Sequence, residues 1–379
     1  MPGSSMATKD VITTLMVGAI GGVALTLLLQ KFGRQAAKGA DGGSGGAKKG
    51  PGGAAGKPKG PGAPPKKNKR KPCQGSFLSE EYGFRYNLTG GVVYPPWSDD
   101  QEEAIQGLMK LDWLQPGDIV VATYPKAGTT LMQQIIMLLL NGGDSEKVGD
   151  VMVTSPWVER EYCTSLDREA GFDEIQSYTT GEGGKRRVFK THAPFNLFPA
   201  ASIPDGVKVV CVVRDPRDVA VSMHKHYQGI PRFKYTGPMN HFLGLFCEGK
   251  VGHGCFFDHL SSWWEGYKKV GVDKMMWIKY EDLVGNKQET VSKVAAFVGA
   301  PDDTSLFEKV CSESDIDVMR TKAEAKAKKG GTFGSATHFN KGVSGTWKKK
   351  LTVAEGEALT AHCASKLEPM KDVELSFEA

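Results

Sequence analysis

The sequence predicts an α/β domain built on a P-loop-like parallel sheet that helices cover on both faces. Short β-branched runs recur along the chain, as expected for buried strands, at Asp118–Tyr124, Arg187–Lys190, Val207–Val213 and Met275–Tyr280. Helical stretches intervene at Thr129–Leu140, Pro216–Tyr227 and Lys287–Val298. The first strand runs into its helix through a turn that contains glycine, an arrangement reminiscent of a P-loop. Strands that alternate with helices favour a parallel sheet covered on both sides.

The N-terminal residues predict a membrane anchor. After a short tail of residues 1–10, Val11–Leu29 carries no charged side chain and is mostly apolar. Its length suits a helix that crosses about 30 Å of hydrocarbon. A signal peptide is the alternative, but the run is longer than the apolar core of a signal and no small-residue cleavage site closes it. We therefore expect one transmembrane helix over residues 11–29.

Residues 30–72 predict a disordered, basic tether. Gly, Ala, Pro and Lys dominate them, and the apolar side chains that offset chain entropy are missing. Twelve Lys and Arg residues stand there against the single acidic residue Asp41. Since the whole chain carries only +5, the residues after the tether are net negative, which argues against nucleic acid as their substrate. The tether is either a plain spacer or a strip that lies on anionic lipid.

The same charge distribution predicts the topology of the anchor. Cationic residues lie overwhelmingly on the C-terminal side of the apolar run. The positive-inside rule then places the tether, and the domain beyond it, in the cytoplasm. The sequon Asn87-Leu88-Thr89 favours the alternative, a Golgi membrane with the domain in the lumen, because glycosylation needs a lumenal site.

From about residue 73 to residue 379 the composition indicates a single globular domain. The seven Cys residues of the chain are scattered, and no pair has a metal-binding spacing such as C-x-x-C. We therefore expect free thiols in a reducing compartment and no metal site.

Tyr124–Thr130 (Tyr-Pro-Lys-Ala-Gly-Thr-Thr) joins the first predicted strand to its helix. Backbone N–H groups and the positive end of the helix are available to an anion at such a turn. Gly128 permits close approach, Thr129 and Thr130 add hydroxyl groups, and Lys126 adds a mobile charge. The ATPase spacing G-x-x-x-x-G-K-[ST] is absent. The turn indicates a phosphate grip, with an ordinary strand–helix connection as the alternative.

Two further strands end in residues that suit a ligand site. Arg214 follows the third strand, and Ser222 lies two turns along the helix that begins at Pro216, so both can converge on one phosphate. His192, within Lys190-Thr-His-Ala-Pro, follows the second strand. Ligands bind at the carboxyl ends of strands in such sheets, and the pKa of His suits a general base. Surface ion pairs and a structural His are the alternatives.

A fourth segment, Phe339–Trp347, follows a Lys- and Gly-rich stretch. Lys341 and Gly342 offer an ammonium group and backbone donors to a phosphate, on a segment flexible enough to act as a lid. A surface loop is the alternative.

Together these four segments resemble the cytosolic-type sulfotransferase family, over about Tyr94–Leu351. The resemblance implies transfer of a sulfonate group from 3′-phosphoadenosine 5′-phosphosulfate to a hydroxyl or amine of a small, lipophilic acceptor, without a metal. It implies that His192 is the base and that Lys126, Lys190 and Ser222 assist it. The implied nucleotide-binding residues are Lys126, Ala127, Gly128, Thr129, Thr130, Leu131, Arg214, Ser222, Tyr280, Ser314, Ile316, Asn340, Lys341 and Gly342.

Three positions depart from the family pattern. Leu131 stands where the family has a Trp near the adenine, Asn340 where it has an Arg, and Ala127 where it has a Ser. These changes predict weaker donor binding with an intact catalytic end. Two other classes remain open: a P-loop nucleoside-phosphate kinase, which the missing Gly-Lys-Ser/Thr disfavours, and a binding or tethering protein without activity.

Overall fold

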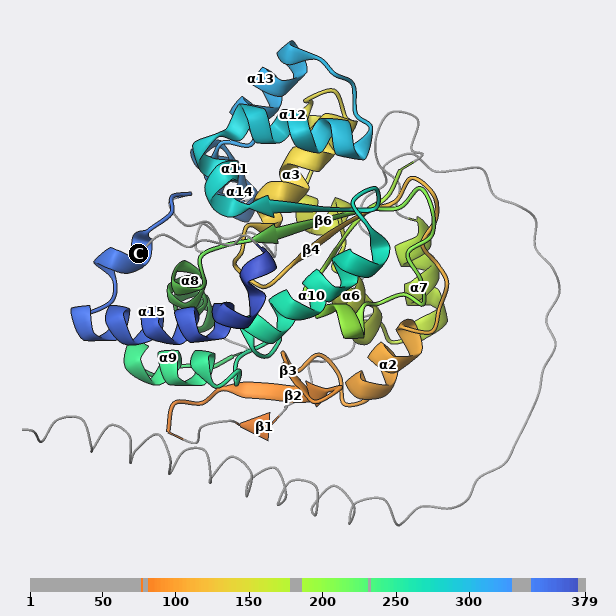
Figure 1. The fold of residues 1–379 in the computed structure, drawn as a ribbon. Coiled ribbons are helices and arrows are strands. Elements are labelled where there is room, and N and C mark those ends of the chain that lie inside the picture. The colour runs from red at the N-terminus through yellow and green to blue at the C-terminus, as the bar shows by residue number, and fades with distance from the viewer. Residues whose placement is uncertain (1–75, 78–80, 178–185, 231–232, 329–341, 374–379) are drawn as a thin grey trace, which may run out of the picture. The chain divides into compact units, whose positions relative to one another are not determined.

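The computed structural model describes residues 76–77, 81–177, 186–230, 233–328 and 342–373 (Figure 1). The predicted anchor and tether lie outside these ranges, as do Asn340 and Lys341. Of the helices in the described ranges, none has both the length and the apolar character that crossing a bilayer requires.

A four-stranded parallel sheet forms the centre of the domain. Its strand order is β5 (Val188–Thr191), β4 (Ile119–Thr123), β6 (Lys208–Val213) and β7 (Met275–Lys279). All four predicted strands are present, with ends that differ from the prediction by at most one residue. In the central register, Val121 pairs with Lys190 on one side and with Val210 on the other. The predicted α/β fold class is confirmed.

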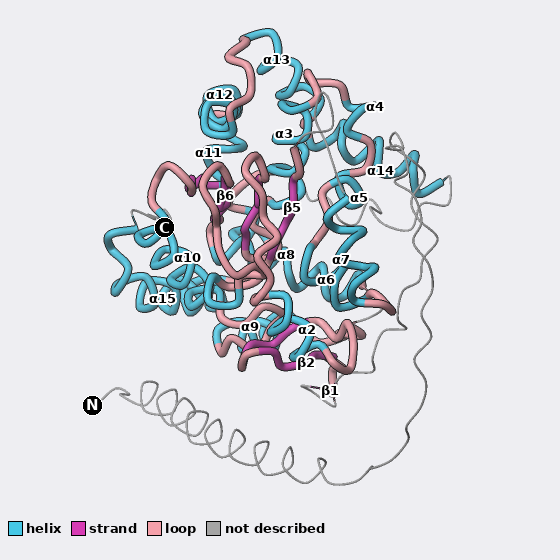
Figure 2. The backbone as a smooth tube through the Cα atoms, turned by 90° about the vertical axis from the view of Figure 1, so that its right-hand side faces the viewer, coloured by secondary structure: helices cyan, strands magenta, loops and turns pink. Residues whose placement is uncertain are grey.

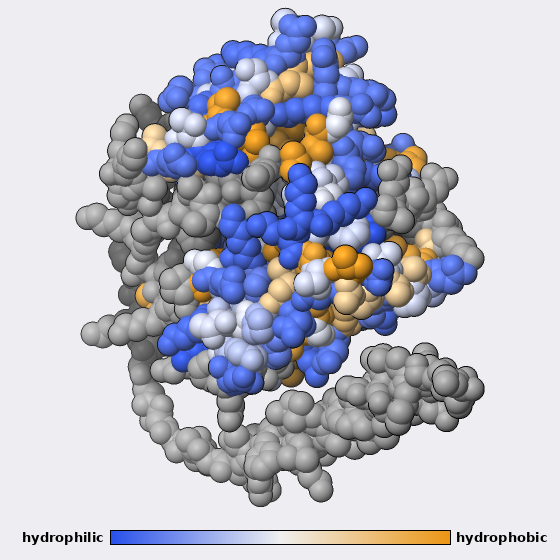
Figure 3. Space-filling view, turned by 90° about the vertical axis from the view of Figure 1, so that its left-hand side faces the viewer, coloured by the Kyte–Doolittle hydropathy of each residue, from blue (hydrophilic) through white to orange (hydrophobic). Residues whose placement is uncertain are grey.

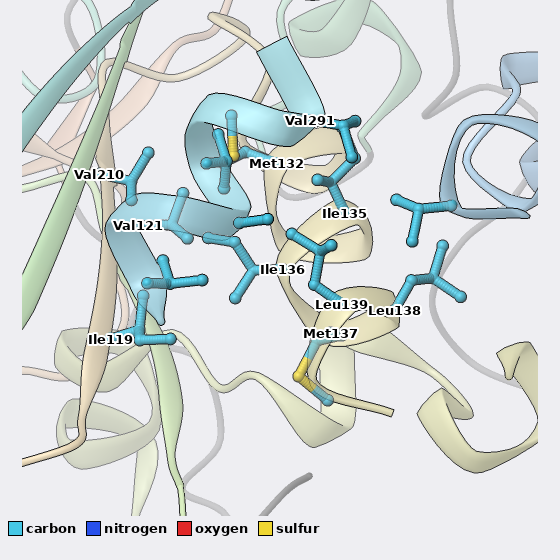
Figure 4. Close-up of a cluster of buried hydrophobic side chains, with 14 of the residues drawn as sticks. Ile119, Val121, Met132, Ile135, Ile136, Met137, Leu138, Leu139, Val210 and Val291 are labelled. Atoms are coloured by element: carbon cyan, nitrogen blue, oxygen red, sulfur yellow. The ribbon is translucent and has the colours of Figure 1, made fainter. Parts of the chain in front are cut away.

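Helices cover both faces of this sheet because its residues are apolar on both sides. Ile119 and Val121 of β4 pack into a cluster with α3 (Thr129–Leu140) and α12 (Lys287–Val298), as Figure 4 shows. The alternate residue Val120 packs into a second cluster on the opposite face. Figures 1 and 2 show the corresponding layers, with α3 and α12 on one side of the strands and α6, α7 and α10 on the other.

The predicted helices appear in place. α3 and α12 keep their predicted bounds, and α8 (Pro216–Gly229) extends two residues beyond its predicted end. The other helical segments are α2 (Gln101–Leu108), α4 (Ser145–Val148), α5 (Val151–Thr154), α6 (Val158–Thr164), α7 (Arg168–Ser177), η1 (Phe195–Leu197), α9 (Met239–Cys247), α10 (Phe256–Val270), α11 (Tyr280–Gly285), α13 (Thr304–Glu313), α14 (Ile316–Lys328), η3 (Thr346–Lys349), α15 (Val353–Leu367) and η4 (Glu368–Val373).

A small antiparallel sheet precedes the main one and was not predicted. It contains β1 (Ser76–Phe77), β2 (Arg85–Thr89) and β3 (Val92–Tyr94). Gly90 and Gly91 join β2 to β3 with φ of 56° and 77°. Positive φ at both turn positions is what a two-residue hairpin requires, so the Gly90-Gly91 pair was the available signal.

The surface of the described residues is mainly polar on the face in Figure 3, where hydrophilic residues surround smaller groups of apolar ones. The large apolar side chains that are exposed belong to separate segments of the chain: Leu88, Val153, Leu166, Val272, Val343 and Val353. Single exposed apolar residues of this kind are ordinary on protein surfaces.

Candidate active site

A cavity of about 350 Å³ lies at the carboxyl ends of β4, β5 and β6, where open α/β sheets bind ligands. The structure brings most of the predicted site residues together in its lining: Lys126, Gly128, Thr129, Thr130, Leu131, Lys190, His192, Arg214, Ser222, Tyr280, Ile316 and Gly342. Ala127 and Ser314 do not line it. The Ser314 side chain is buried, and its hydroxyl donates to the Val310 carbonyl at 2.6 Å.

The turn between β4 and α3 takes its shape from two residues in the left-handed region. Lys126 has φ of 70° and Gly128, the residue before α3, has φ of 111°. A Cβ at Gly128 would lie 2.7 Å from the ring of Tyr280, so only glycine fits there. The first backbone N–H groups of α3 have no partner within the helix, and Thr129 and Thr130 line the cavity. This end of the cavity is therefore suited to an anion.

Ala127 contributes to this turn without facing the cavity. It is buried, and its backbone N–H donates to the Tyr124 carbonyl at 3.2 Å. A serine hydroxyl at this position is therefore not needed to close the turn.

Two lysines carry positive charge into the cavity. Burial, followed by the nearby Arg214, lowers the pKa of Lys126 to about 8. Burial, followed by Arg160, lowers the pKa of Lys190 to about 8. The Lys190 ammonium lies 5.3 Å from the ring centre of Trp157, within the range of a cation–π contact. Both lysines are mostly charged at neutral pH, and both can lose that charge in mild alkali.

The geometry around His192 defines its tautomer. Nδ1 lies 2.8 Å from the main-chain oxygen of Thr123, and a carbonyl oxygen can only accept. The proton therefore sits on Nδ1, and Nε2 keeps a lone pair. Burial, then His253 and Lys190, lower the pKa of His192 well below its usual range. The ring lines the cavity as a neutral imidazole with one basic nitrogen.

A buried carboxylate holds the backbone on which His192 sits. Oε1 of Glu159 accepts from the Thr191 hydroxyl at 2.7 Å, from the His192 N–H at 2.9 Å and from the Ala193 N–H at 3.2 Å. The Trp263 indole N–H donates to the Ala193 carbonyl at 3.0 Å. Burial raises the pKa of Glu159. Sequence reasoning missed Glu159, because a Glu in a short helix predicts a solvated side chain.

Arg214 connects three parts of the cavity wall. Its guanidinium donates to the Lys126 carbonyl at 3.2 Å and to the Val343 carbonyl at 3.3 Å. It also stacks on the Tyr280 ring at 4.3 Å. The exposed fraction of Arg214 is 5%, so any anion that reaches it meets a largely desolvated cation, where charge-assisted hydrogen bonds are strong.

Asp218 is fully buried and joins Arg214 to the C-terminal segment. Its carboxylate accepts from the Gly345 N–H at 2.8 Å, the Trp347 N–H at 3.0 Å and the Thr346 hydroxyl at 2.6 Å. An Arg214 nitrogen lies 3.4 Å away. The segment that begins at Gly342 is thus attached to the start of α8.

Known proteins resemble this chain in sequence and in fold. A family model described as a sulfotransferase domain matches residues 116–372. Sulfotransferase 1B1 of Canis lupus familiaris is 28% identical over 248 residues, which cover 64% of this chain and 81% of the relative. Sulfotransferase 2B1 of Homo sapiens is 29% identical over 290 residues, which cover 74% and 73%.

Two solved structures share the fold. Mouse sulfotransferase SULT7A1 complexed with PAP has a TM-score of 0.59 at 23% identity, over 75% of this chain and 95% of that one. Retinol dehydratase in complex with androsterone and PAP has a TM-score of 0.59 at 20% identity, over 76% and 88%. The resemblance carried by the four segments is confirmed: the family model covers more than half of the chain, and the protein belongs to the sulfotransferase family.

Proposed function

We propose that the protein transfers a sulfonate group from 3′-phosphoadenosine 5′-phosphosulfate to a hydroxyl of a small acceptor, with His192 as the base. The observation that carries the proposal is the shared cavity: a neutral imidazole with a basic Nε2 lies in the same lining as the anion-binding turn and Arg214. That two structural neighbours hold PAP supports the choice of donor.

The donor fits the cavity through its charges. We assign its 5′-phosphosulfate end to Lys126 and the first N–H groups of α3, and its 3′-phosphate to Arg214, Ser222 and the segment that starts at Gly342. Leu131, Tyr280 and Ile316 line the cavity and offer apolar or aromatic surface to the adenine of the donor. Lys341 and Asn340, which the resemblance also implies, lie outside the described residues.

The reaction then follows from position and charge. The acceptor hydroxyl gives its proton to Nε2 of His192 as its oxygen attacks sulfur in line. The bond between sulfur and the bridging oxygen breaks, and its electrons stay on the phosphate. Lys126 neutralises the charge that grows there, Lys190 assists, and Ser222 holds Lys126 away until the acceptor binds. Such preorganised donors are usually the largest single contribution to catalysis.

The cavity favours uncharged acceptors. Among the described residues that line it there is no Asp or Glu, whereas Lys126, Arg160, Lys190 and Arg214 all reach it. A protonated amine would find no counter-charge, while Trp97, Trp157 and Phe233 offer apolar surface. We therefore assign the acceptor to neutral, lipophilic hydroxyl compounds.

A paired acceptor screen tests the proposed function. The full chain, with labelled donor, is assayed on alcohols and phenols and on the matching amines of the same carbon skeleton, without added magnesium. We expect sulfonated hydroxyl products and no faster transfer to any amine. A requirement for magnesium would indicate a kinase instead. Tight binding of adenosine 3′,5′-bisphosphate with no turnover on any acceptor would indicate a binding protein.

We also propose that residues 11–29 anchor the protein with its catalytic domain on the cytoplasmic side. Besides the charge bias, the side chain of Asn87 supports this side. Its amide nitrogen donates to the Ser98 carbonyl at 3.0 Å and to the Gln101 side chain at 3.3 Å, bonds that a glycan on this nitrogen would disturb. Glycosidase treatment of the membrane fraction tests the topology. If the treatment lowers the apparent mass of the wild-type protein but not that of Asn87→Gln, the domain lies in the lumen.

The two lysines predict an alkaline limb in the pH profile. Lys126 and Lys190 each have a pKa of about 8, and the charged form is the useful one. Because lysine loses its charge as pH rises through its pKa, kcat/KM of the free enzyme should fall above about pH 8. Lys190→Arg stays charged, so this variant should keep only the part of the decrease in kcat/KM that comes from the loss of charge on Lys126. A flat profile from about pH 7 to 9.5 would contradict both roles.

Asp218→Asn is expected to weaken nucleotide binding. The amide loses the charge that faces Arg214 and offers an N–H where backbone N–H groups of Gly345 and Trp347 need an acceptor. The Kd of adenosine 3′,5′-bisphosphate, measured by calorimetry, should rise about tenfold or more. Glu289→Gln, which removes an exposed carboxylate paired with Lys293 at 2.6 Å, is the control and should leave Kd within about twofold. An unchanged Kd in Asp218→Asn would show that the attachment of the C-terminal segment to Asp218 does not support nucleotide binding.

A further inference from the structure

A chain of hydroxyl groups connects His192 to the anion-binding turn. Nδ1 of His192 lies 3.3 Å from the Thr123 hydroxyl oxygen, in addition to its 2.8 Å contact with the Thr123 carbonyl. The Thr123 hydroxyl in turn lies 2.6 Å from the hydroxyl of Thr129. Thr123 is the last residue of β4, and Thr129 is the first residue of α3 and lines the cavity. The chain therefore runs behind the cavity wall from the base to the turn assigned to the phosphosulfate.

The direction of every hydrogen bond in this chain follows from one end. Because the Thr123 carbonyl can only accept, Nδ1 carries a proton, and the Thr123 hydroxyl near it acts as an acceptor. Thr129 is the acceptor that the described contacts leave for the hydrogen of the Thr123 hydroxyl, so we assign Thr123 as the donor to Thr129. The Thr129 hydrogen is left to donate outward, on the cavity side. The hydrogen on Nδ1 is shared between the Thr123 carbonyl at 2.8 Å and the Thr123 hydroxyl at 3.3 Å, and the two threonine hydroxyl groups continue from there toward the anion-binding turn.

We propose that Thr123 is a positioning residue that couples the base His192 to the leaving group through Thr129. This inference rests on the proposed function, in which positive charge grows on His192 while negative charge grows on the phosphate oxygen. The chain lies between these two charges with its dipoles aligned to both. Hydrogen bonds in series polarise one another, and more so in a water-poor interior. Positive charge on His192 thus strengthens the hydrogen bond that Thr129 donates on the phosphate side, and negative charge on the phosphate strengthens the hydrogen bond that Nδ1 of His192 donates.

No additional proton leaves its atom in this scheme. The acceptor's proton comes to rest on Nε2, and the electrons of the broken sulfur–oxygen bond stay on the phosphate. The hydrogens on Nδ1, Thr123 and Thr129 remain on their donors while the three bonds shorten in the transition state. Thr123 is 2% exposed and does not line the cavity, so it acts through its neighbours.

Thr123→Val tests the coupling, because it removes the hydroxyl and keeps the volume and the main-chain carbonyl that orients His192. The single-turnover rate constant with saturating donor and acceptor should fall about tenfold. The Kd of adenosine 3′,5′-bisphosphate and the acceptor KM should stay within about twofold. Thr123→Ser, which restores the hydroxyl, should recover a rate within about threefold of the wild type.

Solvent isotope effects separate this role from a purely structural one. In mixtures of H₂O and D₂O the wild-type rate should follow a curved proton inventory, because several hydrogens change their bonding. Thr123→Val should give a straight line, as expected when only the acceptor's proton contributes. Thr191→Val is the matched control: it removes another buried hydroxyl beside His192, one that donates to Glu159 at 2.7 Å instead of joining the chain. Its inventory should stay curved.

The outcomes are distinguishable from failure of the proposed function. A wild-type rate in Thr123→Val, no recovery in Thr123→Ser, or weaker nucleotide binding without a change in rate would each overturn the coupling. None of these bears on the base itself. Full activity in a His192 variant would instead disprove the proposed function of His192 as the base, and with it the reason to propose the coupling through Thr123 and Thr129.

Discussion

Replacing His192 by Gln is expected to lower kcat by a factor of about 10²–10⁴, the usual contribution of a positioned general base to the rate. Gln has a similar size and can still donate to the Thr123 carbonyl, which His192 contacts at 2.8 Å, but its amide cannot take a proton. The loss should therefore fall on the chemical step. Single-turnover transfer from labelled donor measures it, and the Kd of adenosine 3′,5′-bisphosphate should change by less than about twofold.

A second imidazole in the same cavity supplies the control for this experiment. His226 lines the cavity from α8, so His226→Gln makes the same chemical change at another position of the lining. We expect it to alter acceptor KM more than kcat. Equal losses of kcat in the two variants would mean that removal of any histidine disturbs the cavity, and the assignment of His192 would be wrong. Near-full turnover in His192→Gln would equally exclude His192 as the base.

Replacing Lys126 by Met is expected to lower kcat by about 10²–10³, the typical loss when one preorganised group facing the developing charge is removed. Met keeps much of the aliphatic volume, so the turn that contains Gly128 should survive. Binding of the donor should also weaken, because Lys126 faces its anionic end in the ground state as well. Rapid-quench transfer with donor at several concentrations separates the two effects.

Lys225 is the matched control for Lys126. It lies close enough to contribute to the lowered pKa of Lys126, yet it is exposed and does not line the cavity. Lys225→Met should change kcat by less than about twofold, because a solvated charge is screened from the reacting atoms. If Lys225→Met and Lys126→Met lost similar activity, the effect would be one of general electrostatics, and the contact with the leaving oxygen would be disproved.

The sequence predicted the part of the site that depends on local order along the chain. β-branched runs with helices between them define a parallel sheet, and residues just after a strand must gather at its carboxyl edge. This is why Lys126, His192 and Arg214 could be identified from the sequence. The bounds of α3 were predictable at both ends, because Gly is accepted directly before a helix, as at Gly128, and Asn commonly follows the last residue of one, as at Asn141.

What the sequence did not reveal depends on packing between distant segments. Thr123, Glu159 and Asp218 are polar residues whose place in the site comes from partners 32 to 129 positions away or from the turn that follows. Nothing in the residues beside Glu159 and Asp218 distinguishes them from solvated residues, and the buried strand predicted around Thr123 does not reveal the partners of its hydroxyl. Ser314 shows the converse case: a motif match predicted a contact with the nucleotide, while its hydroxyl donates to the Val310 carbonyl in the last turn of α13.

The attachment of the C-terminal segment to Asp218 also orders events in time. Its hydrogen bonds join residues 126 to 129 positions apart, and contacts of such separation cost the most loop entropy to close. During synthesis, the sheet and the turn at Lys126 can form while the residues after Gly342 are still inside the ribosome. The nucleotide site can therefore be completed only after this segment has left the ribosome, and a nascent chain that stalls before then would be folded in its centre but unable to hold its donor.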